Sequence, residues 1–422
     1  MNNTYKTSKN QEDNTLIPFG YKKTAIGIIP IDWETKKLGD LGDIINGLTY
    51  SPNEISDDGI LVLRSSNIKD RQLIYTDNVF VKADKFNPVK KGDILICVRN
   101  GSKSLIGKNA LITEEAEGYA FGAFMAVFRS DYNNYLYQIF GTDLFQKEIH
   151  KNLGATINSI NGSDLKLFKL PIPPQPEQQK IAEILSTWDD AISTCKKTID
   201  TLKERNKGLA QQLLTGKKRL GGFSEKWNNT QLGKISKRVT AKNEELNDTV
   251  VTISAQRGFV LQEDFFNKRV ASDTLSGYYL LKKGQFAYNK SYSNGYPMGA
   301  FKRLNNFEKA VVTTLYICFE LLENVNSDYM VHFFENGFMT NNLMKVAKEG
   351  GRAHGLLNIG LEDFMSLELT ISSFEEQTAI AQVLETADQE LKSYEAKLEA
   401  LQLQKKGLMQ QLLTGKIRVN VK

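Results

Sequence analysis

The residues that could support covalent chemistry in this sequence are few, and none has the spacing of a catalytic motif. Residues 101–109, "GSKSLIGKN", come nearest to a phosphate-binding loop. They have one residue too many between the glycines, and Asn109 stands where Ser or Thr would bind magnesium. The segment "INGSDL" at 160–165 lacks the glycine spacing of a nucleophile elbow. A basic glycine loop of this kind is more typical of contact with a nucleic-acid backbone than of ATP binding.

Cysteine and histidine residues do not form a metal site in this sequence. The three cysteines have no paired spacing and lie in apolar runs: Cys97, Cys195 and Cys318. A zinc site needs close pairs of ligands, and the three histidines are far from the cysteines and from each other. Buried free thiols in a reducing cytoplasm are therefore expected. We predict that this chain holds no metal and no catalytic residue.

Length and composition indicate a multidomain protein of ordinary globular type. A chain of 422 residues is too long for one core, and 41% hydrophobic with 24% charged residues is unexceptional. No apolar run approaches the ~18 residues of a membrane-spanning helix. Residues 1–19 begin with a polar stretch that lacks the apolar core of a secretory signal, and we expect a polar tail. The net charge of +5 permits a nucleic-acid partner without demanding one.

A repeat organises the chain. The heptapeptide "QQLLTGK" occurs at 211–217 and again at 410–416. Extending the match upstream aligns 171–220 with 370–419 without a gap, and about twenty of roughly fifty positions are identical. Each copy has acidic residues at a helix start and a glycine just after the last apolar pair. These signals predict a long helix at 171–217 and another at 370–422, the latter with a C-terminal tail.

The apolar residues of both copies recur in alternating steps of four and three, which is the heptad pattern of a coiled coil. In the first helix the seam residues are Ile181, Leu185, Trp188, Ile192, Cys195, Ile199, Leu202, Leu209 and Leu213, and in the second they are Ile380, Leu384, Ala387, Leu391, Tyr394, Leu398, Leu401, Leu408 and Leu412. We predict that the two helices pair antiparallel within the chain. Asn206 and Lys405 interrupt the two seams at the same position. The pattern leaves open whether they fix the register or lie at a solvated end of the seam.

The remaining sequence forms two blocks, 20–170 and 218–369, that resemble each other weakly. "IPIDWETKKLGDL" and "FSEKWNNTQLGKI" align Trp33 with Trp227, and "VKKGDILICVRN" resembles "LKKGQFAYNKSY". Both blocks mix short β-type runs, such as "GDILICV" and "GQFAYNK", with glycine-rich loops and helical stretches. We predict an α+β fold with two similar globular domains, separated by the two helices and related by a pseudo-twofold axis.

These features together resemble the DNA-specificity subunit of type I restriction–modification enzymes. The resemblance rests on the order domain–helix–domain–helix, on "PIPPQPEQ" entering a long helix, on "LLTGK" ending it, and on the "KKGDILI" and "W-x-x-x-x-L-G" phrases. It covers nearly the whole chain, although "TISSFEEQ" lacks the prolines before the second helix. It implies that each globular block is a target-recognition domain for one half of a split, asymmetric DNA site. The helices would act as a spacer between them.

If the blocks read DNA, lysine and arginine should contact phosphates, while arginine, amide and hydroxyl side chains on loops should reach base edges. Loops rich in these residue types supply the candidates in the first block: Arg64, Asn67, Lys69, Arg99, Asn100, Lys103 and Asn158. Those of the second block are Gln256, Arg257, Lys290, Tyr292, Asn294, Arg352 and His354. A turn residue that bonds only its local backbone is the alternative at each position.

The resemblance also implies partners and cofactors outside this chain. Methyltransferase subunits, two of them, would dock on the helices and carry S-adenosylmethionine. Restriction subunits would bring ATP and magnesium, and the complex would act in the bacterial cytoplasm. Two alternatives remain open from the sequence. One is a stand-alone coiled-coil DNA-binding regulator, and the other is an enzyme with an unrecognised nuclease or methylase site.

Overall fold

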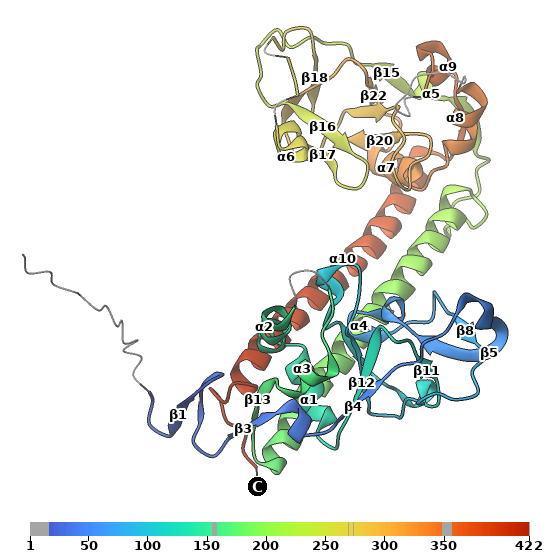
Figure 1. Ribbon diagram of the computed structural model, residues 1–422. Helices are drawn as coiled ribbons and strands as arrows, with labels where there is room; N and C mark the ends of the chain where they lie inside the picture. The colour runs from blue at the N-terminus through green and yellow to red at the C-terminus, as the bar shows by residue number, and fades with distance from the viewer. Residues whose placement is uncertain (1–16, 154–157, 269, 273, 348–356, 422) are drawn as a thin grey trace, which may run out of the picture. The chain divides into compact units, whose positions relative to one another are not determined.

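The computed structural model describes residues 17–153, 158–268, 270–272, 274–347 and 357–421 (Figure 1). It divides into two compact units. Unit 1 comprises Met1–Thr194 and Leu398–Lys422, and unit 2 comprises Cys195–Lys397. Each unit therefore combines one globular block with a part of both long helices.

The globular part of unit 1 is built on a four-stranded antiparallel sheet with the strand order β10–β9–β12–β4. Its strands are β4 Asp43–Asn46, β9 Ile94–Cys97, β10 Asn109–Leu111 and β12 Met125–Arg129. Every residue of β9 is buried, and so are the first four of β12, which explains why these segments read as continuous apolar runs. A second sheet has the order β11–β5–β8, with β5 Ile55–Leu63, β8 Phe80–Val81 and β11 Ala120–Phe121.

The described part of unit 1 also contains smaller strand pairs and short helices. The pairs are β1 Tyr21–Thr24 with β2 Gly27–Pro30, β3 Glu34–Lys37 with β13 Lys169–Ile172, and β6 Ile68–Lys69 with β7 Gln72–Leu73. The helices are α1 Asn133–Phe140, α2 Asp143–Asn152 and α3 Gly162–Lys166.

Unit 2 repeats the main sheet of unit 1 in the same order, as β20–β19–β22–β15. These strands are β15 Ser236–Arg238, β19 Phe286–Asn289, β20 Ala300–Arg303 and β22 Ile317–Leu321. The other strand pairs are β14 Asn228–Gln231 with β23 Glu368–Ile371, β16 Val251–Ser254 with β17 Gly258–Leu261, and β18 Tyr279–Lys282 with β21 Lys309–Val312. The helices are α5 Leu232–Ile235, α6 Gln262–Phe266, α7 Ser327–Glu335, α8 Thr340–Val346 and α9 Leu361–Met365. The predicted duplicated α+β fold is confirmed.

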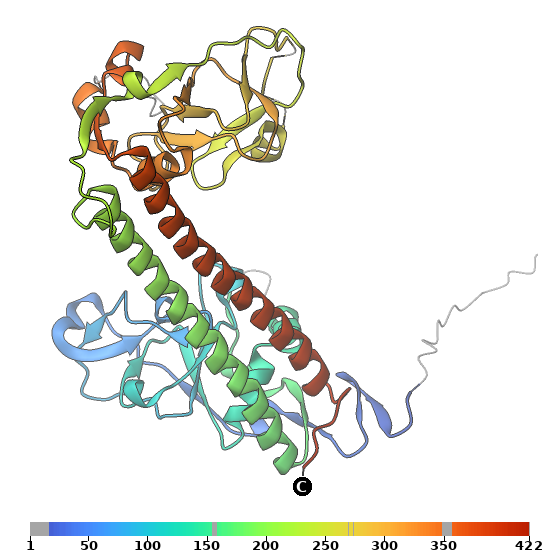
Figure 2. The same cartoon turned by 180° about the vertical axis from the view of Figure 1, so that it is seen from behind.

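The two long helices are α4 Gln175–Leu214 and α10 Phe374–Leu412. They start four residues later than the repeat alone suggested, because the residues before them pair as strands β13 and β23. Within each unit the helices run antiparallel, side by side in both views (Figure 2). In unit 1 Lys405 contacts Asp189, and in unit 2 Asn206 contacts Ala387, so that rising numbers on α4 meet falling numbers on α10. The expected antiparallel coiled coil is therefore present.

Every seam side chain is either buried or half-buried. Those that are buried are Ile181, Leu185, Cys195, Ile199, Leu202, Leu213, Ile380, Leu384, Ala387 and Leu412. Those that are half-buried are Trp188, Ile192, Leu209, Leu391, Tyr394, Leu398, Leu401 and Leu408. Burial is deepest at the helix ends, where Ile181 and Leu185 of α4 and Leu412 of α10 join the core of unit 1. In unit 2 Leu213, Ile380 and Leu384 do the same. The helix ends are thus part of each globular core.

The two polar seam positions are both paired across the helices. Lys405 is buried, and its Nζ lies 2.5 Å from Oδ1 of Asp189. The other oxygen of this carboxylate, Oδ2, accepts a hydrogen bond from Nε2 of Gln138. Asn206 donates from Nδ2 to the Ala387 carbonyl at 2.9 Å and to Asp388 Oδ1 at 3.4 Å. Because Asp189 and Asp388 are equivalent in the repeat, the same acidic position faces a lysine in one unit and an asparagine in the other. The solvated-end interpretation does not hold for Lys405.

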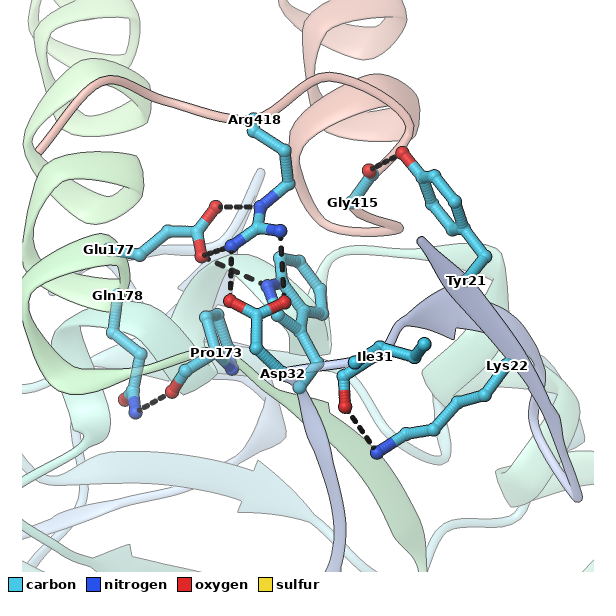
Figure 3. Close-up of polar contacts among 10 residues, drawn as sticks. Tyr21, Lys22, Ile31, Asp32, Pro173, Glu177, Gln178, Gly415 and Arg418 are labelled. Carbon is cyan, nitrogen blue, oxygen red and sulfur yellow. Dashed lines mark hydrogen bonds and ion pairs between the residues drawn. The ribbon is translucent and has the colours of Figure 1, made fainter. Parts of the chain in front are cut away.

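A buried glutamate at the start of each long helix joins that helix to its globular part. In unit 1 the carboxylate of Glu177 accepts a hydrogen bond from Trp33 Nε1 at 3.0 Å. It also binds the guanidinium of Arg418 through Nε and Nη2, both at 2.8 Å (Figure 3). Arg418 reaches Asp32 at 2.9 and 2.6 Å as well, and this contact lowers the pKa of the Asp32 carboxyl. We call this Trp–Glu–Arg set the clasp.

Unit 2 contains the same clasp, built from the equivalent residues of the repeat. Arg219 binds the buried Glu376 through Nε at 2.6 Å and Nη2 at 2.7 Å, and Trp227 Nε1 donates to the same carboxylate at 3.0 Å. Lys226 stands where unit 1 has Asp32, and the neighbouring Glu225 instead lies near enough to Arg219 to act on its charge. The clasp explains the recurrence of tryptophan, of "EQ" and of the basic residue after "LLTGK".

The glycine of "LLTGK" turns the chain toward the clasp. Gly216 and Gly415 have φ of 69° and 71°, the left-handed conformation that commonly ends a helix. A Cβ at Gly415 would lie 2.4 Å from Cγ of Pro30 in β2. Both backbone conformation and space therefore require glycine at this position, three residues before the clasp arginine.

Candidate nucleic-acid interface

Four loop segments of unit 1 are bonded into one cluster at the end of β9. The amides of Val98 and Arg99 both donate to the Phe124 carbonyl, at 3.0 and 3.1 Å. The Asn100 amide donates to the Asn158 carbonyl at 3.2 Å, and the Asn100 side chain donates to Ser65 Oγ at 3.1 Å. We call the segments 64–66, 98–103, 122–125 and 158–159 the unit 1 loop cluster.

The predicted residues of this cluster divide into two kinds. Arg99 and Lys103 are exposed, and Lys103 begins a short 3-10 helix, Lys103–Leu105. Asn100 and Asn158 are half-buried and use their amides to hold the loops, since Asn100 Oδ1 accepts from the Ser102 amide and Asn158 donates to the Gly101 carbonyl. The cations are thus presented to solvent on a loop that the asparagines keep in shape.

Two further predicted cations lie at the edge of the cluster or outside it. Arg64 is half-buried and forms an ion pair of 2.8 Å with Asp77. Its charge is therefore partly compensated before any ligand binds. Lys69 is exposed on β6, next to a turn in which Asp70 and Arg71 have φ of 49° and 64°.

Asn67 lies inside its loop, so the expectation that it reaches a base edge is not retained. The side chain is fully buried. Its oxygen accepts from the Arg64 amide at 3.0 Å, and its nitrogen donates to the Ile74 carbonyl and to Asn78. Asn67 holds the loop after β5 in place, which is the alternative role of a turn residue.

In unit 2 the corresponding loops after β16 and β19 also meet. Gln256 donates from Nε2 to the Asn294 carbonyl at 3.0 Å, and Leu357 donates from its amide to the Lys290 carbonyl, also at 3.0 Å. Arg257 and Asn294 are exposed, and Tyr292 is 64% exposed. Lys290 is half-buried. The other two predicted residues, Arg352 and His354, lie outside the described residues.

Each unit places an exposed arginine beside an exposed phenylalanine ring. The guanidinium carbon of Arg99 lies 5.7 Å from the centroid of Phe124, and that of Arg257 lies 5.7 Å from the centroid of Phe265. At these distances the cation and the ring attract each other. The sequence analysis missed both rings. Phe124 stands in the run "AFMAVFRS", where an apolar residue reads as a buried strand position.

The described residues hold no cluster of metal ligands, and two of the cysteine thiols are poor nucleophiles. Among them, no group of three or more His, Cys, Asp and Glu side chains could hold a metal ion. Burial raises the pKa of the Cys97 thiol, and it raises that of Cys318 to about 12. Neither thiol is a thiolate at neutral pH, as a nucleophile would need. Within the same part of the chain, no helix is long and apolar enough to cross a membrane.

Known proteins with similar sequences are specificity subunits of type I restriction enzymes. Residues 30–204 match the family described as "Type I restriction modification DNA specificity domain". The putative type I restriction enzyme MjaX specificity subunit of Methanocaldococcus jannaschii is 29% identical, and the match covers 94% of this chain and 97% of that protein. The EcoKI specificity subunit of Escherichia coli is 30% identical over 49% of this chain and 46% of its own length.

A solved structure supports the fold. The S subunit of a type I restriction–modification system from M. genitalium aligns with a TM-score of 0.55 at 17% identity, covering 90% of this chain and 96% of that one. The family match falls on the first copy of the repeat, whereas the relative from M. jannaschii and the solved structure span both copies. Residues 30–204 thus match the DNA specificity domain of type I restriction–modification enzymes, and the chain is similar over nearly its whole length to a specificity subunit of such an enzyme.

Proposed function

We propose that this chain recognises a bipartite, asymmetric DNA site, with one half read by the loop cluster of each unit, and that it has no catalytic residue of its own. The observation that carries the proposal is the duplication. The same four-stranded sheet occurs in both units, and in each the loop after the inner strand β9 or β19 gathers amide and basic side chains. The two loops differ in sequence, as expected if they read different bases.

The exposed cations give the interface its affinity, and the loop frame gives it selectivity. Arg99, Lys103 and Arg257 can each neutralise a phosphate or bond the edge of a guanine. The asparagine bonds beneath them limit the loop conformations, so that less entropy is lost on binding.

The chain acts as a scaffold for subunits that do the chemistry. Methyltransferase subunits, one for each half of the duplicated helix pair, supply S-adenosylmethionine, and restriction subunits supply ATP and magnesium. The supporting observations are the family match of residues 30–204 and the exposed outward faces of α4 and α10. The helix residues that face away from the seam are largely polar. A polar surface stays soluble when the chain is free and can still be covered by another protein in the assembled enzyme. The complex acts in the cytoplasm, where its DNA lies.

The test is to map methylated bases in a genome with and without this gene, and then with two single variants. The two variants should act on different halves of the site, since each exposed arginine lies in one unit. Arg99→Ala should relax or weaken one half by about 10- to 100-fold, as expected for one lost base contact of ~1–3 kcal/mol. Arg257→Ala should do the same to the other half only.

A control separates recognition from folding. Lys91→Ala removes an exposed lysine of unit 1 that lies outside the loop cluster and should leave both halves unchanged. The proposal is contradicted if no methylated motif depends on the gene. It is also contradicted if the chain alone transfers methyl groups from labelled S-adenosylmethionine to DNA.

A further inference from the structure

Phe124 is an exposed apolar side chain on a rigid turn. The ring is 56% exposed, although Phe121 and Met125 on either side are each only 1% exposed. The turn is bonded to three other segments. The Ala123 amide donates to the Leu48 carbonyl at 2.8 Å, the Gly122 amide donates to the Leu63 carbonyl at 3.0 Å, and the Phe124 carbonyl accepts from the loop after β9. A backbone fixed in this way holds the ring outward.

The Phe124 ring lies in the unit 1 loop cluster, beside the loop after β9. Its neighbour is the exposed Arg99, and the backbone of Phe124 bonds the amide of that same residue. The ring also forms one wall of a groove of about 520 Å³, which Leu48, Tyr50 and Met125 line together with Arg64 and Ser65. Ser65 in turn holds Asn100. The apolar surface therefore lies within the unit 1 loop cluster.

The chemistry of DNA contains one apolar group that such a surface can select. In the major groove, thymine presents a 5-methyl group, and no other unmodified base does. An arginine that bonds a guanine edge brings its neighbouring side chain to the adjacent base pair. A phenyl ring held beside the guanidinium can then cover the methyl group of a thymine in that pair.

We propose that Phe124 is a specificity-determining residue of unit 1 that recognises a thymine methyl group next to the base pair contacted by Arg99. The inference rests on the proposed function. It adds one apolar contact with DNA to the hydrogen bonds that the polar side chains of the loop cluster would make. It also predicts that the half-site of unit 1 contains an A·T pair, because only that pair carries the methyl group.

The test uses the full chain with its methyltransferase partner and duplexes carrying the mapped site. The half read by unit 1 is the one that Arg99→Ala relaxes. Each thymine in that half is replaced in turn by deoxyuridine, which lacks only the methyl group. One replacement should weaken binding by the wild-type complex about fourfold, the factor for one buried methyl group. Phe124→Ala should bind the two duplexes equally, and Phe124→Leu should keep part of the difference.

Two matched variants act as controls. Phe265→Ala removes the ring that faces Arg257 in unit 2 and should keep the wild-type response to deoxyuridine in the unit 1 half. Leu167→Ala removes another exposed apolar side chain of unit 1, 59% exposed, and should also keep it.

The inference is overturned if no deoxyuridine in that half weakens the wild-type complex, or if Phe124→Ala responds as the wild type does. It is equally overturned if Phe124→Ala loses affinity only for the methyltransferase, since the ring would then dock a protein. Failure of the proposed function looks different. In that case the wild-type complex has no preferred site, no half can be assigned to unit 1, and both proposals fall.

Discussion

At the scale of single residues, the clasps are buried ion pairs that tolerate little change in residue type. Glu177 and Glu376 are each 1% exposed, and a buried carboxylate is costly unless it is paired and hydrogen-bonded. In each unit a bidentate arginine and an indole N–H occupy the carboxylate oxygens. The planar guanidinium suits this geometry, and a lysine could not reproduce it. The residue at positions 219 and 418 is therefore fixed by chemistry, although it lies outside the helix.

Removing a clasp arginine should loosen the unit that contains it. Arg418→Ala leaves Glu177 buried with only the Trp33 N–H, and we expect local stability to fall by about 2 kcal/mol. Since Arg418 is itself 41% exposed, the loss should stay below that of a fully buried pair. Hydrogen exchange of the amides of β3 and of the first turn of α4 would measure it.

The surface pair of Arg205 with Glu390 offers the matched control for the clasp. Both side chains are about half exposed, and Arg205→Ala should cost less than about 1 kcal/mol. Equal effects of the two substitutions, or an effect of Arg418→Ala spread evenly over both units, would show that the clasp adds nothing beyond a surface ion pair.

Residue types indicated part of the candidate site, but their roles needed the structure. The sequence identified the loops after β5 and β9, because basic and amide residues follow apolar runs there. It did not separate Asn67, which bonds its own loop, from Asn100 beside the exposed cations, since both are turn-forming residues between strands. Phe124 was missed because a phenylalanine in an apolar run is usually buried. Its exposure depends on a turn that only tertiary hydrogen bonds fix.

At the scale of elements, the equivalent polar positions of the two seams make different contacts, an ion pair in unit 1 and hydrogen bonds in unit 2. Lys405 makes an ion pair with Asp189, and Asn206 makes hydrogen bonds to the equivalent Asp388 and its neighbour. In either unit, a slipped register would place the polar group against an apolar seam residue without its partner. The paired positions therefore favour one alignment of α4 with α10.

Truncating the buried lysine should destabilise the helix pair in unit 1. Lys405→Ala leaves Asp189 with the Gln138 amide but without its cation, and we expect a loss of about 1.5 kcal/mol. Lys405→Asn introduces the residue found at the equivalent position of α4, Asn206, and should recover part of the lost stability. The neighbouring Lys406 is exposed, so Lys406→Ala should change stability by less than about 0.5 kcal/mol. Exchange rates of the α10 amides around residue 405 would report each change. A neutral Lys405→Ala would contradict the role in register.

The long helices were predictable because periodicity is a local signal, readable over several turns of one segment. The inner main-sheet strands β9 and β19 followed from apolar runs for the same reason. The clasps were not predictable in this way. Arg418 meets residues 386 and 241 positions earlier in the chain, and no local pattern links them. The repeat did show that tryptophan, glutamate and the basic residue recur together, although it could not show that they touch.

At the scale of the whole molecule, the proposed function makes helix length a determinant of the DNA site. Seven residues added to α4 between Lys197 and Thr198, matched by seven in α10 between Glu395 and Ala396, add two turns and keep both seams facing each other. They also leave the clasps intact. The gap between half-sites should then grow by about 10 Å, or about three base pairs, while the bases in each half stay the same. Methylation mapping gives gap and bases together.

Adding four residues to each helix instead turns the seam by about 40° and should reduce methylation at every site. If the heptad variant kept the original gap, or changed the bases read within a half, the helices would not be the spacer between the two reading units.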